Sequence, residues 1–157
     1  MNRVMRGFTL VELMVVIVVL GILYFTLMLY PGTLLNITPV AQQFAQDVRY
    51  TQNLAMTRGQ VFYLSIDSAT TYSIHDSTGV AQTHPYTHTT TLKLGNKLTF
   101  TSVTNLPNNV ISFNVYGYPY TDVAATTPLL LAARICFQLG SESKCIVVNP
   151  GTGYVTS

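Results

Sequence analysis

The first thirty residues constrain this chain more than any other part of it. An apolar stretch of 23 residues runs from Phe8 to Tyr30, and Glu12 is the one charged residue within it. About 20 apolar residues are enough for a helix to cross a bilayer. A carboxylate at mid-bilayer costs about 2.5–3.5 kcal/mol on insertion scales. We therefore expect a membrane helix in which Glu12 has either a partner or a function.

The charges around this stretch predict its orientation. Arg3 and Arg6 precede it, and no further Lys or Arg occurs before Arg49. The positive-inside bias places the N-terminus in the cytoplasm and the rest of the chain outside the inner membrane. A secretory signal would have a 7–15-residue apolar core followed by a small-residue cleavage site, and no Ala-x-Ala follows here. An ordinary membrane anchor would leave Glu12 unexplained.

The junction at Gly7 resembles the N-terminus of type IV pilins and pseudopilins, through the run Arg6-Gly7-Phe8-Thr9-Leu10-Val11-Glu12-Leu13. The resemblance implies that a prepilin peptidase cuts between Gly7 and Phe8 on the cytoplasmic side and then methylates the new N-terminal Phe8. It also implies that Glu12 is the assembly residue, which pairs with the N-terminus of a neighbouring subunit.

These features predict three segments. Residues 1–7 are the leader, residues 8–31 the transmembrane and assembly helix, and residues 32–157 a periplasmic globular domain. One globular domain suits a chain of 157 residues. Pro31 and Gly32 are expected to end or kink the first helix, because proline disfavours helical geometry at the residue before it.

A second helix is predicted to begin near Pro39, with Thr38 as its N-cap. Val40, Phe44 and Val48 form an apolar stripe of helical period. The pattern ends in Arg58 and then Gly59, a residue suited to the position just after a helix. We expect the stripe to be core that packs this helix onto a sheet.

Residues 42–60 resemble one branch of the pilin-like proteins, the GspH/FimT minor pilins and pseudopilins. Their helix has the form L-x-x-D-x-R-x-A-x-x-x-A-x-x-R-G and runs into the first strand. Six positions match this form: Phe44, Asp47, Arg49, Ala55, Arg58 and Gly59. Gln52 stands where a small residue is commoner. Ile111-Ser112-Phe113-Asn114, which precedes Gly117, also resembles a strand and turn of this branch.

The rest of the chain has the composition of strands, rich in Thr, Tyr, Val and Ser. The predicted strands cover residues 61–66, 71–75, 89–94, 98–103, 110–115, 129–139 and 144–148. No helix-periodic segment follows residue 60. The predicted fold is therefore α+β, with a long N-terminal transmembrane and amphipathic helix packed on an antiparallel β-sheet sandwich.

Two cysteines, Cys136 and Cys145, lie on the two arms of the last predicted hairpin, around the turn at residues 140–143. Outside the inner membrane they are expected to form a disulfide. Closing such a short loop contributes about 2–3 kcal/mol by chain entropy. A metal or redox pair is a weaker interpretation, because the cysteines are nine residues apart and no histidine is near.

Histidine spacing gives no metal site. His84 and His88 have the i, i+4 spacing that suits a metal on a helix. Pro85 and the threonines around it oppose a helix, and no third ligand is near. We expect an exposed loop here, a strand position for His75, and no metal or other cofactor.

No catalytic motif is evident either. Residues 149–153 are glycine-rich but lack the Lys-Ser/Thr ending of a phosphate loop. Residues 140–143 are followed by a strand rather than the helix of a nucleophile elbow. The sequence therefore predicts a protein that is not an enzyme.

DNA binding is also disfavoured. Some relatives in this branch bind DNA through a basic C-terminal segment, but residues 151–157 contain no Lys or Arg. Without the leader, six basic and six acidic side chains remain, which gives little attraction to phosphates. Tyr116, Tyr118 and Tyr120 could stack on bases, but a subunit contact is the better interpretation because tyrosine is enriched at interfaces.

The sequence thus predicts a minor pilin or pseudopilin that is cleaved by prepilin peptidase and joins a filament or its tip. Its expected partners are that peptidase, the inner membrane, and other pilins or pseudopilins through the N-terminal helix. The alternative is a pilus-associated DNA receptor for natural transformation. The sequence does not distinguish a subunit of a type IV pilus from one of a type II secretion pseudopilus, because both share the signal and the fold.

Overall fold

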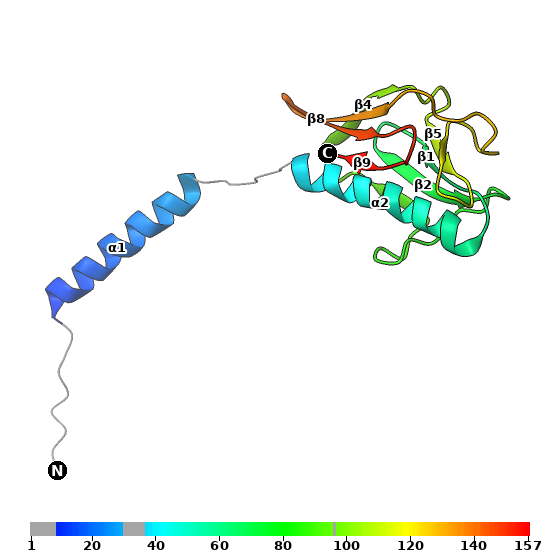
Figure 1. Ribbon diagram of the computed structural model, residues 1–157. Helices are drawn as coiled ribbons and strands as arrows, with labels where there is room; N and C mark the ends of the chain where they lie inside the picture. The colour runs from blue at the N-terminus through cyan, green and yellow to red at the C-terminus, as the bar shows by residue number, and fades with distance from the viewer. Residues whose placement is uncertain (1–8, 30–36, 96) are drawn as a thin grey trace, which may run out of the picture. The chain divides into compact units, whose positions relative to one another are not determined.

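The computed structural model describes residues 9–29, 37–95 and 97–157 (Figure 1). The chain divides into two units, Met1–Leu34 and Leu35–Ser157. Each unit is described by itself below.

The first unit contains helix α1 (Leu10–Leu29). Thr9 caps it: the Glu12 backbone N–H lies 3.3 Å from the Thr9 hydroxyl and 3.0 Å from the Thr9 carbonyl oxygen. The large apolar side chains from Leu10 to Phe25 are exposed. Counting only the described residues, no helix has the length and apolar character needed to cross a membrane. The span predicted over residues 8–31 is therefore not confirmed, and Phe8, Tyr30, Pro31 and the expected break at Pro31-Gly32 lie outside the described residues.

The second unit begins with helix α2 (Ile37–Arg58). The predicted N-cap is wrong, because the helix already includes Ile37 and holds Thr38 and Pro39 in its first turn. The Ile37 side chain is buried in the core, so packing favours the earlier start, and proline is tolerated in a first turn. The predicted end is confirmed: Gly59, with φ 64°, donates its backbone N–H to the Ala55 carbonyl oxygen.

Two antiparallel sheets complete the second unit. The first has the order β3-β2-β1-β5-β6 and the second the order β4-β7-β8-β9. The strands of the first sheet are β1 (Phe62–Ile66), β2 (Thr71–Asp76), β3 (Thr91–Lys93), β5 (Val110–Phe113) and β6 (Pro119–Tyr120). Those of the second are β4 (Leu98–Thr104), β7 (Ala133–Leu139), β8 (Glu142–Val148) and β9 (Val155–Thr156).

The strands differ from the predicted ones in several details. Strand β3 covers residues 91–93 rather than 89–94, and β5 ends at Phe113 rather than at residue 115. Strands β6 and β9 are two residues long and too short to give a sequence pattern. Strand β7 begins at Ala133 rather than at residue 129. Strand β8 begins at Glu142, so the last hairpin turns at Gly140-Ser141 instead of over residues 140–143.

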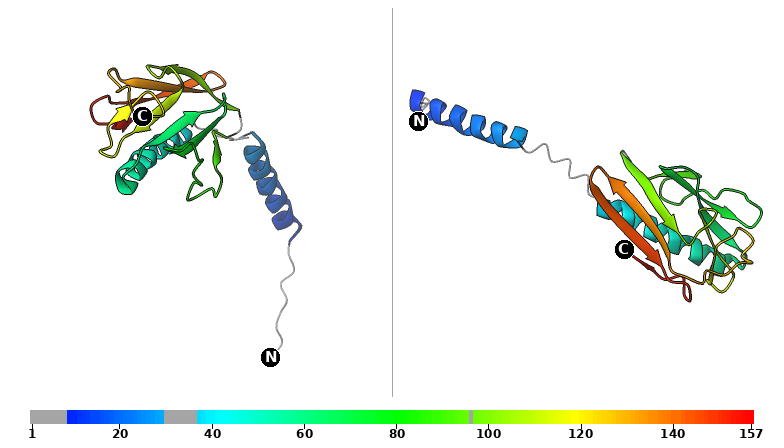
Figure 2. Two further views of the ribbon diagram at one scale, coloured as in Figure 1. Left: turned by 90° about the vertical axis from the view of Figure 1, so that its right-hand side faces the viewer. Right: turned by 90° about the horizontal axis from the view of Figure 1, so that it is seen from above.

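Helix α2 packs against strands of both sheets, as Figures 1 and 2 show. Phe44 lies at the centre of the core and is fully buried. Its ring meets those of Tyr72, Phe100 and Phe137 edge-on, with centroids 4.8–5.4 Å apart. Val48 is equally buried and Val40 partly so, which confirms the predicted stripe and the α+β fold.

Candidate functional site

Glu12 is the third residue of α1, and its backbone N–H is held by the Thr9 cap. A Thr-x-x-Glu start is the sequence of a capping box, and a carboxylate in the first turn interacts favourably with the helix dipole. Glu12 therefore has a local role available besides the predicted pairing with a neighbour. Gly7 and Phe8, the predicted processing site, lie outside the described residues.

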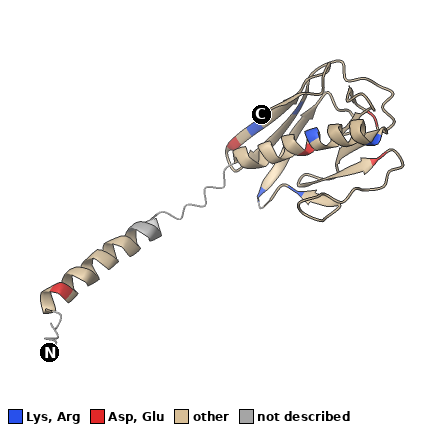
Figure 3. Cartoon of the chain, turned by 60° about the horizontal axis from the view of Figure 1, so that its bottom comes forward, with Lys and Arg blue, Asp and Glu red and all other residues tan. Residues whose placement is uncertain are grey.

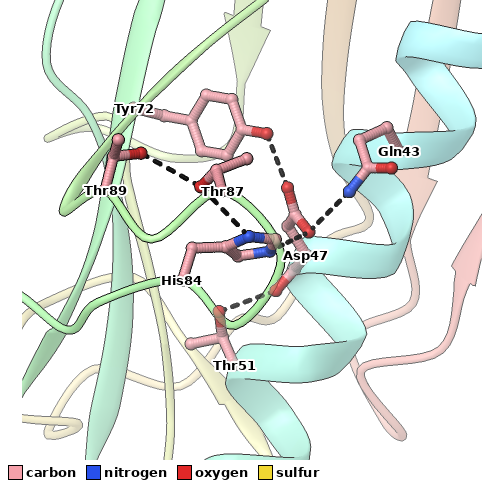
Figure 4. A network of polar contacts seen from close by, with 7 residues as sticks. All are labelled: Gln43, Asp47, Thr51, Tyr72, His84, Thr87 and Thr89. Carbon is pink, nitrogen blue, oxygen red and sulfur yellow. Dashed lines mark hydrogen bonds and ion pairs between the residues drawn. The ribbon is translucent and has the colours of Figure 1, made fainter.

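A buried polar network joins α2 to strand β2 and to the loop of residues 84–89 (Figure 4). Asp47 is at its centre. One carboxylate oxygen of Asp47 lies 3.1 Å from the Gln43 side-chain amide and 3.1 Å from His84 Nε2. The other accepts a 2.6 Å hydrogen bond from the Tyr72 hydroxyl. Asp47 and His84 are each 3 % exposed at the side chain, so this is an interior contact.

The exposed loop predicted for His84 is wrong. The His84 backbone N–H donates to the Thr89 carbonyl, and the His88 backbone N–H donates to the His84 carbonyl, so the segment closes on itself. His88 adopts a positive φ of 54° and stays exposed. The closed loop directs the His84 ring inward to Asp47, where its edge meets the Tyr50 ring. The two histidines consequently do not share a site.

The network has a structural role, because its hydrogen bonds hold helix α2 to strand β2 and to the loop that carries His84. Burial raises the pKa of Tyr72 well above its ordinary value of 10.0, and the charge of Asp47 and the hydrogen bond to it raise it further. A cavity of 540 Å³ borders the network and is lined in part by Tyr86 and Lys93. The buried side-chain polar atoms of the described residues all have hydrogen-bond partners, so none is left unsatisfied in the interior beside this cavity.

A Ser-His-Asp group also occurs, on strand β2 and the turn before it. The Ser73 hydroxyl donates to the Asp67 carboxylate at 2.6 Å and lies 2.8 Å from His75 Nε2. Asp67 therefore contacts the serine rather than the histidine, and His75 Nδ1 lies 3.1 Å from the Gly79 carbonyl oxygen. This order of contacts is not that of a catalytic triad. His75 occupies the strand position predicted for it.

Two polar residues of α2 tie it to distant parts of the chain. Arg49 donates to the Val155 carbonyl at 2.5 Å and lies over the Tyr154 ring. The Gln52 amide nitrogen lies 2.8 Å from the carbonyl oxygens of both Gly117 and Thr152. Gln52 therefore has a structural role, since it binds two loops to the helix. Its departure from the family pattern is the sequence signal that could have indicated this role.

The loops that Gln52 holds approach the helix closely. Gly117 has φ 81° and Gly153 has φ 67°. A Cβ on Gly117 would lie 2.8 Å from Met56 Sδ, and one on Gly153 would lie 2.8 Å from a Phe113 ring carbon. Both positions therefore require glycine for conformation and for space.

The predicted disulfide is confirmed. Cys136 and Cys145 are bonded, and they are directly opposed across β7 and β8 with their Cα atoms 4.0 Å apart. The bond lies symmetrically about the Gly140-Ser141 turn. It reinforces the hairpin of the second sheet.

Two basic residues that could have contributed to a DNA-binding surface, Lys97 and Arg134, do not lie close together. Strand β4 pairs with β7 so that Leu98 faces Leu139 and Thr104 faces Arg134. At about 3.4 Å a residue, Lys97 and Arg134 are about 20 Å apart along the strands. Among residues 9–29, 37–95 and 97–157 there is also no group of three His, Cys, Asp or Glu side chains able to hold a metal ion.

The tyrosines of the predicted contact loop are not equivalent. Tyr116 and Tyr118 are exposed. Tyr120 belongs to strand β6 and is half-buried, and its hydroxyl accepts a 3.2 Å hydrogen bond from the Asn114 amide. Two of the three tyrosines, rather than all three, are therefore available to a partner.

Comparisons with known families match both parts of the chain. Residues 2–23 match the prokaryotic N-terminal methylation motif. Residues 40–152 match the family of type II transport protein GspH. No curated protein sequence matches significantly.

Solved structures share the fold. The type IV minor pilin FimU of Pseudomonas aeruginosa matches with a TM-score of 0.53 at 10 % identity, over 76 % of this chain and 86 % of that one. The minor pseudopilin EpsH from the type 2 secretion system of Vibrio cholerae matches with a TM-score of 0.53 at 16 % identity, over 74 % of this chain and 93 % of that one. At such identities the likeness concerns the fold alone.

Proposed function

This chain belongs to the family of type II transport protein GspH, and from that premise we propose that it is stored in the inner membrane and then joins a pilin-like filament or its tip. As a minor pilin or pseudopilin of the GspH/FimT type it is a structural subunit and not an enzyme. The observation that carries the proposal is the combination in one chain of the methylation motif at residues 2–23 and the family match over residues 40–152.

The N-terminal motif supports a specific processing step. Prepilin peptidase cuts between Gly7 and Phe8 and methylates Phe8. The amine of the new N-terminus is then the positive partner that Glu12 of a neighbouring subunit needs in an apolar surrounding. Subunits associate through this contact and through the exposed apolar side chains of α1.

The proposed topology is a single pass. The segment from Phe8 to Tyr30 spans the membrane with its N-terminus in the cytoplasm, because Arg3 and Arg6 precede it. Residues 32–157 lie in the periplasm before assembly. The disulfide agrees with that compartment, since such bonds persist under oxidising conditions.

The filament is either a type IV pilus or a type II secretion pseudopilus. The two structural neighbours come one from each system and match equally well, at a TM-score of 0.53. The fold therefore favours neither.

Fractionation of cells tests the proposal. We expect the chain in the inner membrane and also in filaments sheared from the cells or assembled on them. Deleting the prepilin peptidase should retain it in the membrane at its full length and remove it from the filaments. A chain that stays in the membrane while the filaments form without it contradicts the proposal.

A DNA receptor is the function from another class, and we expect it to be absent. Lys97 and Arg134 are separated along β4 and β7, and Arg49 is engaged by Val155 and Tyr154. The globular unit, whose core lies wholly within residues 37–155, should bind duplex DNA no better than about 10⁻⁴ M at physiological salt. Titration of a labelled duplex measures this. Micromolar, salt-sensitive binding that is lost in Lys93→Ala/Lys97→Ala would restore the receptor interpretation.

A further inference from the structure

An apolar surface lies at the end of α2 that is remote from the chain connection to α1. Five exposed side chains define this distal patch: Met56, Tyr116, Tyr118, Leu130 and Leu131. Tyr116 is 77 % and Leu130 80 % exposed, values at which such large apolar groups lose most of the benefit of burial. Isolated exposed apolar residues are ordinary, but a contiguous group of them marks an interaction site.

Backbone contacts bring together the segments that carry Met56, the two tyrosines and Leu130. Gly117, between the two tyrosines, lies against Met56, whose sulfur would be 2.8 Å from a Cβ placed on that glycine. Tyr120 and Pro128 form an isolated antiparallel β-bridge. Beside it, the Leu129 backbone N–H donates to the Pro119 carbonyl oxygen at 3.0 Å. This register places Tyr118 opposite Leu130.

The patch is held in shape before any partner binds. The Asn114 side-chain oxygen accepts the backbone N–H groups of Tyr116 and Tyr118, each at 3.0 Å. Between Val115 and Ala133 the one charged residue in the sequence is Asp122. Its carboxylate is used by the loop itself, accepting the backbone N–H groups of Thr126 and Thr127. A preformed apolar surface binds with a small loss of conformational entropy.

The opposite end of the second sheet has different chemistry. Gln52 of α2 binds the carbonyl of Thr152, which follows the end of strand β8. The end of β8 therefore lies near Gln52, and its first residue, Glu142, lies about 20 Å away toward the start of α2. Lys97, Glu142 and Lys144 lie at that end of β4 and of the β7–β8 hairpin, and Figure 3 shows charged residues there. The two ends of the globular unit are therefore not complementary to each other.

We propose that the distal patch is the contact for a different pilin-type subunit, whose facing surface is apolar and uncharged. The inference rests on the proposed function and adds the partner surface to it. If a second copy stacked end to end on the first, its Lys97, Glu142 and Lys144 would lie against the patch. These charged groups would then lose their contact with water, which is costly. A two-fold contact between two patches would reverse one copy, whereas all subunits of a filament drawn from one membrane point the same way.

Site-specific photo-crosslinking of the full chain in its own cells tests the proposal. A benzophenone amino acid replaces Tyr116, Tyr118 or Leu130 in turn, with Val80 and Tyr86 as exposed control positions outside the patch. We expect at least tenfold more crosslinking from the patch positions. Mass spectrometry should identify the partner as another chain that carries its own prepilin-type N-terminus. Crosslinks to a second copy, to lipid or to DNA, or equal yields at the control positions, overturn the proposal.

A charge substitution gives an independent readout. Leu130→Asp should lower the amount of the chain in filaments at least tenfold, and Val80→Asp should not. Far-UV circular dichroism of each purified variant, compared with the unaltered chain, reports whether the variant is folded. Normal incorporation of folded Leu130→Asp overturns the patch alone, whereas absence of the unaltered chain from filaments overturns the proposed function itself.

Discussion

Glu12→Ala is expected to leave cleavage at Gly7 intact and to exclude the chain from filaments. Removing one partner of a buried charge pair costs about 3–5 kcal/mol, because the other charge is left uncompensated. That loss corresponds to a decrease in incorporation of about 150-fold to 4,000-fold. The ratio of filament-bound to membrane-bound chain, measured by quantitative immunoblotting, gives the result.

Two matched variants separate pairing from capping. Glu12→Gln keeps the size and hydrogen bonding of the side chain but removes its charge. Thr9→Ala removes the hydroxyl that lies 3.3 Å from the Glu12 N–H and keeps the carboxylate. Pairing predicts that Glu12→Gln fails like Glu12→Ala and that Thr9→Ala assembles. The reverse result would make Glu12 a helix-capping residue and refute its role in assembly.

Asp47→Ala should cause the largest loss of stability in the globular unit. The substitution strands the Tyr72 hydroxyl and His84 Nε2 in the interior, where both now bond to the carboxylate. Losing one member of such a buried network costs about 3–5 kcal/mol. Urea unfolding followed by far-UV circular dichroism measures the free energy of unfolding. Gln46→Ala, at an exposed position one residue away, is the control and should change it by less than about 0.5 kcal/mol.

A double-mutant cycle tests whether the cost comes from the network. Tyr72→Phe should destabilise the unaltered protein by about 1–3 kcal/mol, because it removes a hydrogen bond to a charged group. In the Asp47→Ala background the same change should cost much less, since its partner is already gone. Equal costs in both backgrounds would show that Asp47 and Tyr72 do not interact energetically.

The sequence predicted those parts of the fold that depend on near neighbours along the chain. The stripe of Val40, Phe44 and Val48 repeats every four residues, so it is visible without a structure. The last hairpin is equally local, because its two cysteines are nine residues apart around one turn.

Contacts between distant residues were beyond the sequence pattern. His84 and Asp47 are 37 residues apart, and nothing near His84 distinguishes an inward ring from one in an exposed threonine-rich loop. Arg49 reaches the Val155 carbonyl across 106 residues. That contact accompanies the two-residue strand β9, which is too short to show alternation. These elements exist because the assembled core holds them rather than through local preference.

The most direct test of the central claim is the N-terminal peptide of the chain recovered from purified filaments. Its mass and fragmentation spectrum should show a chain that begins with N-methyl-phenylalanine at residue 8. This single observation reports cleavage, methylation and assembly in the same molecule. A filament-associated chain that begins at Met1, or one that is cut after residue 30, would contradict the account.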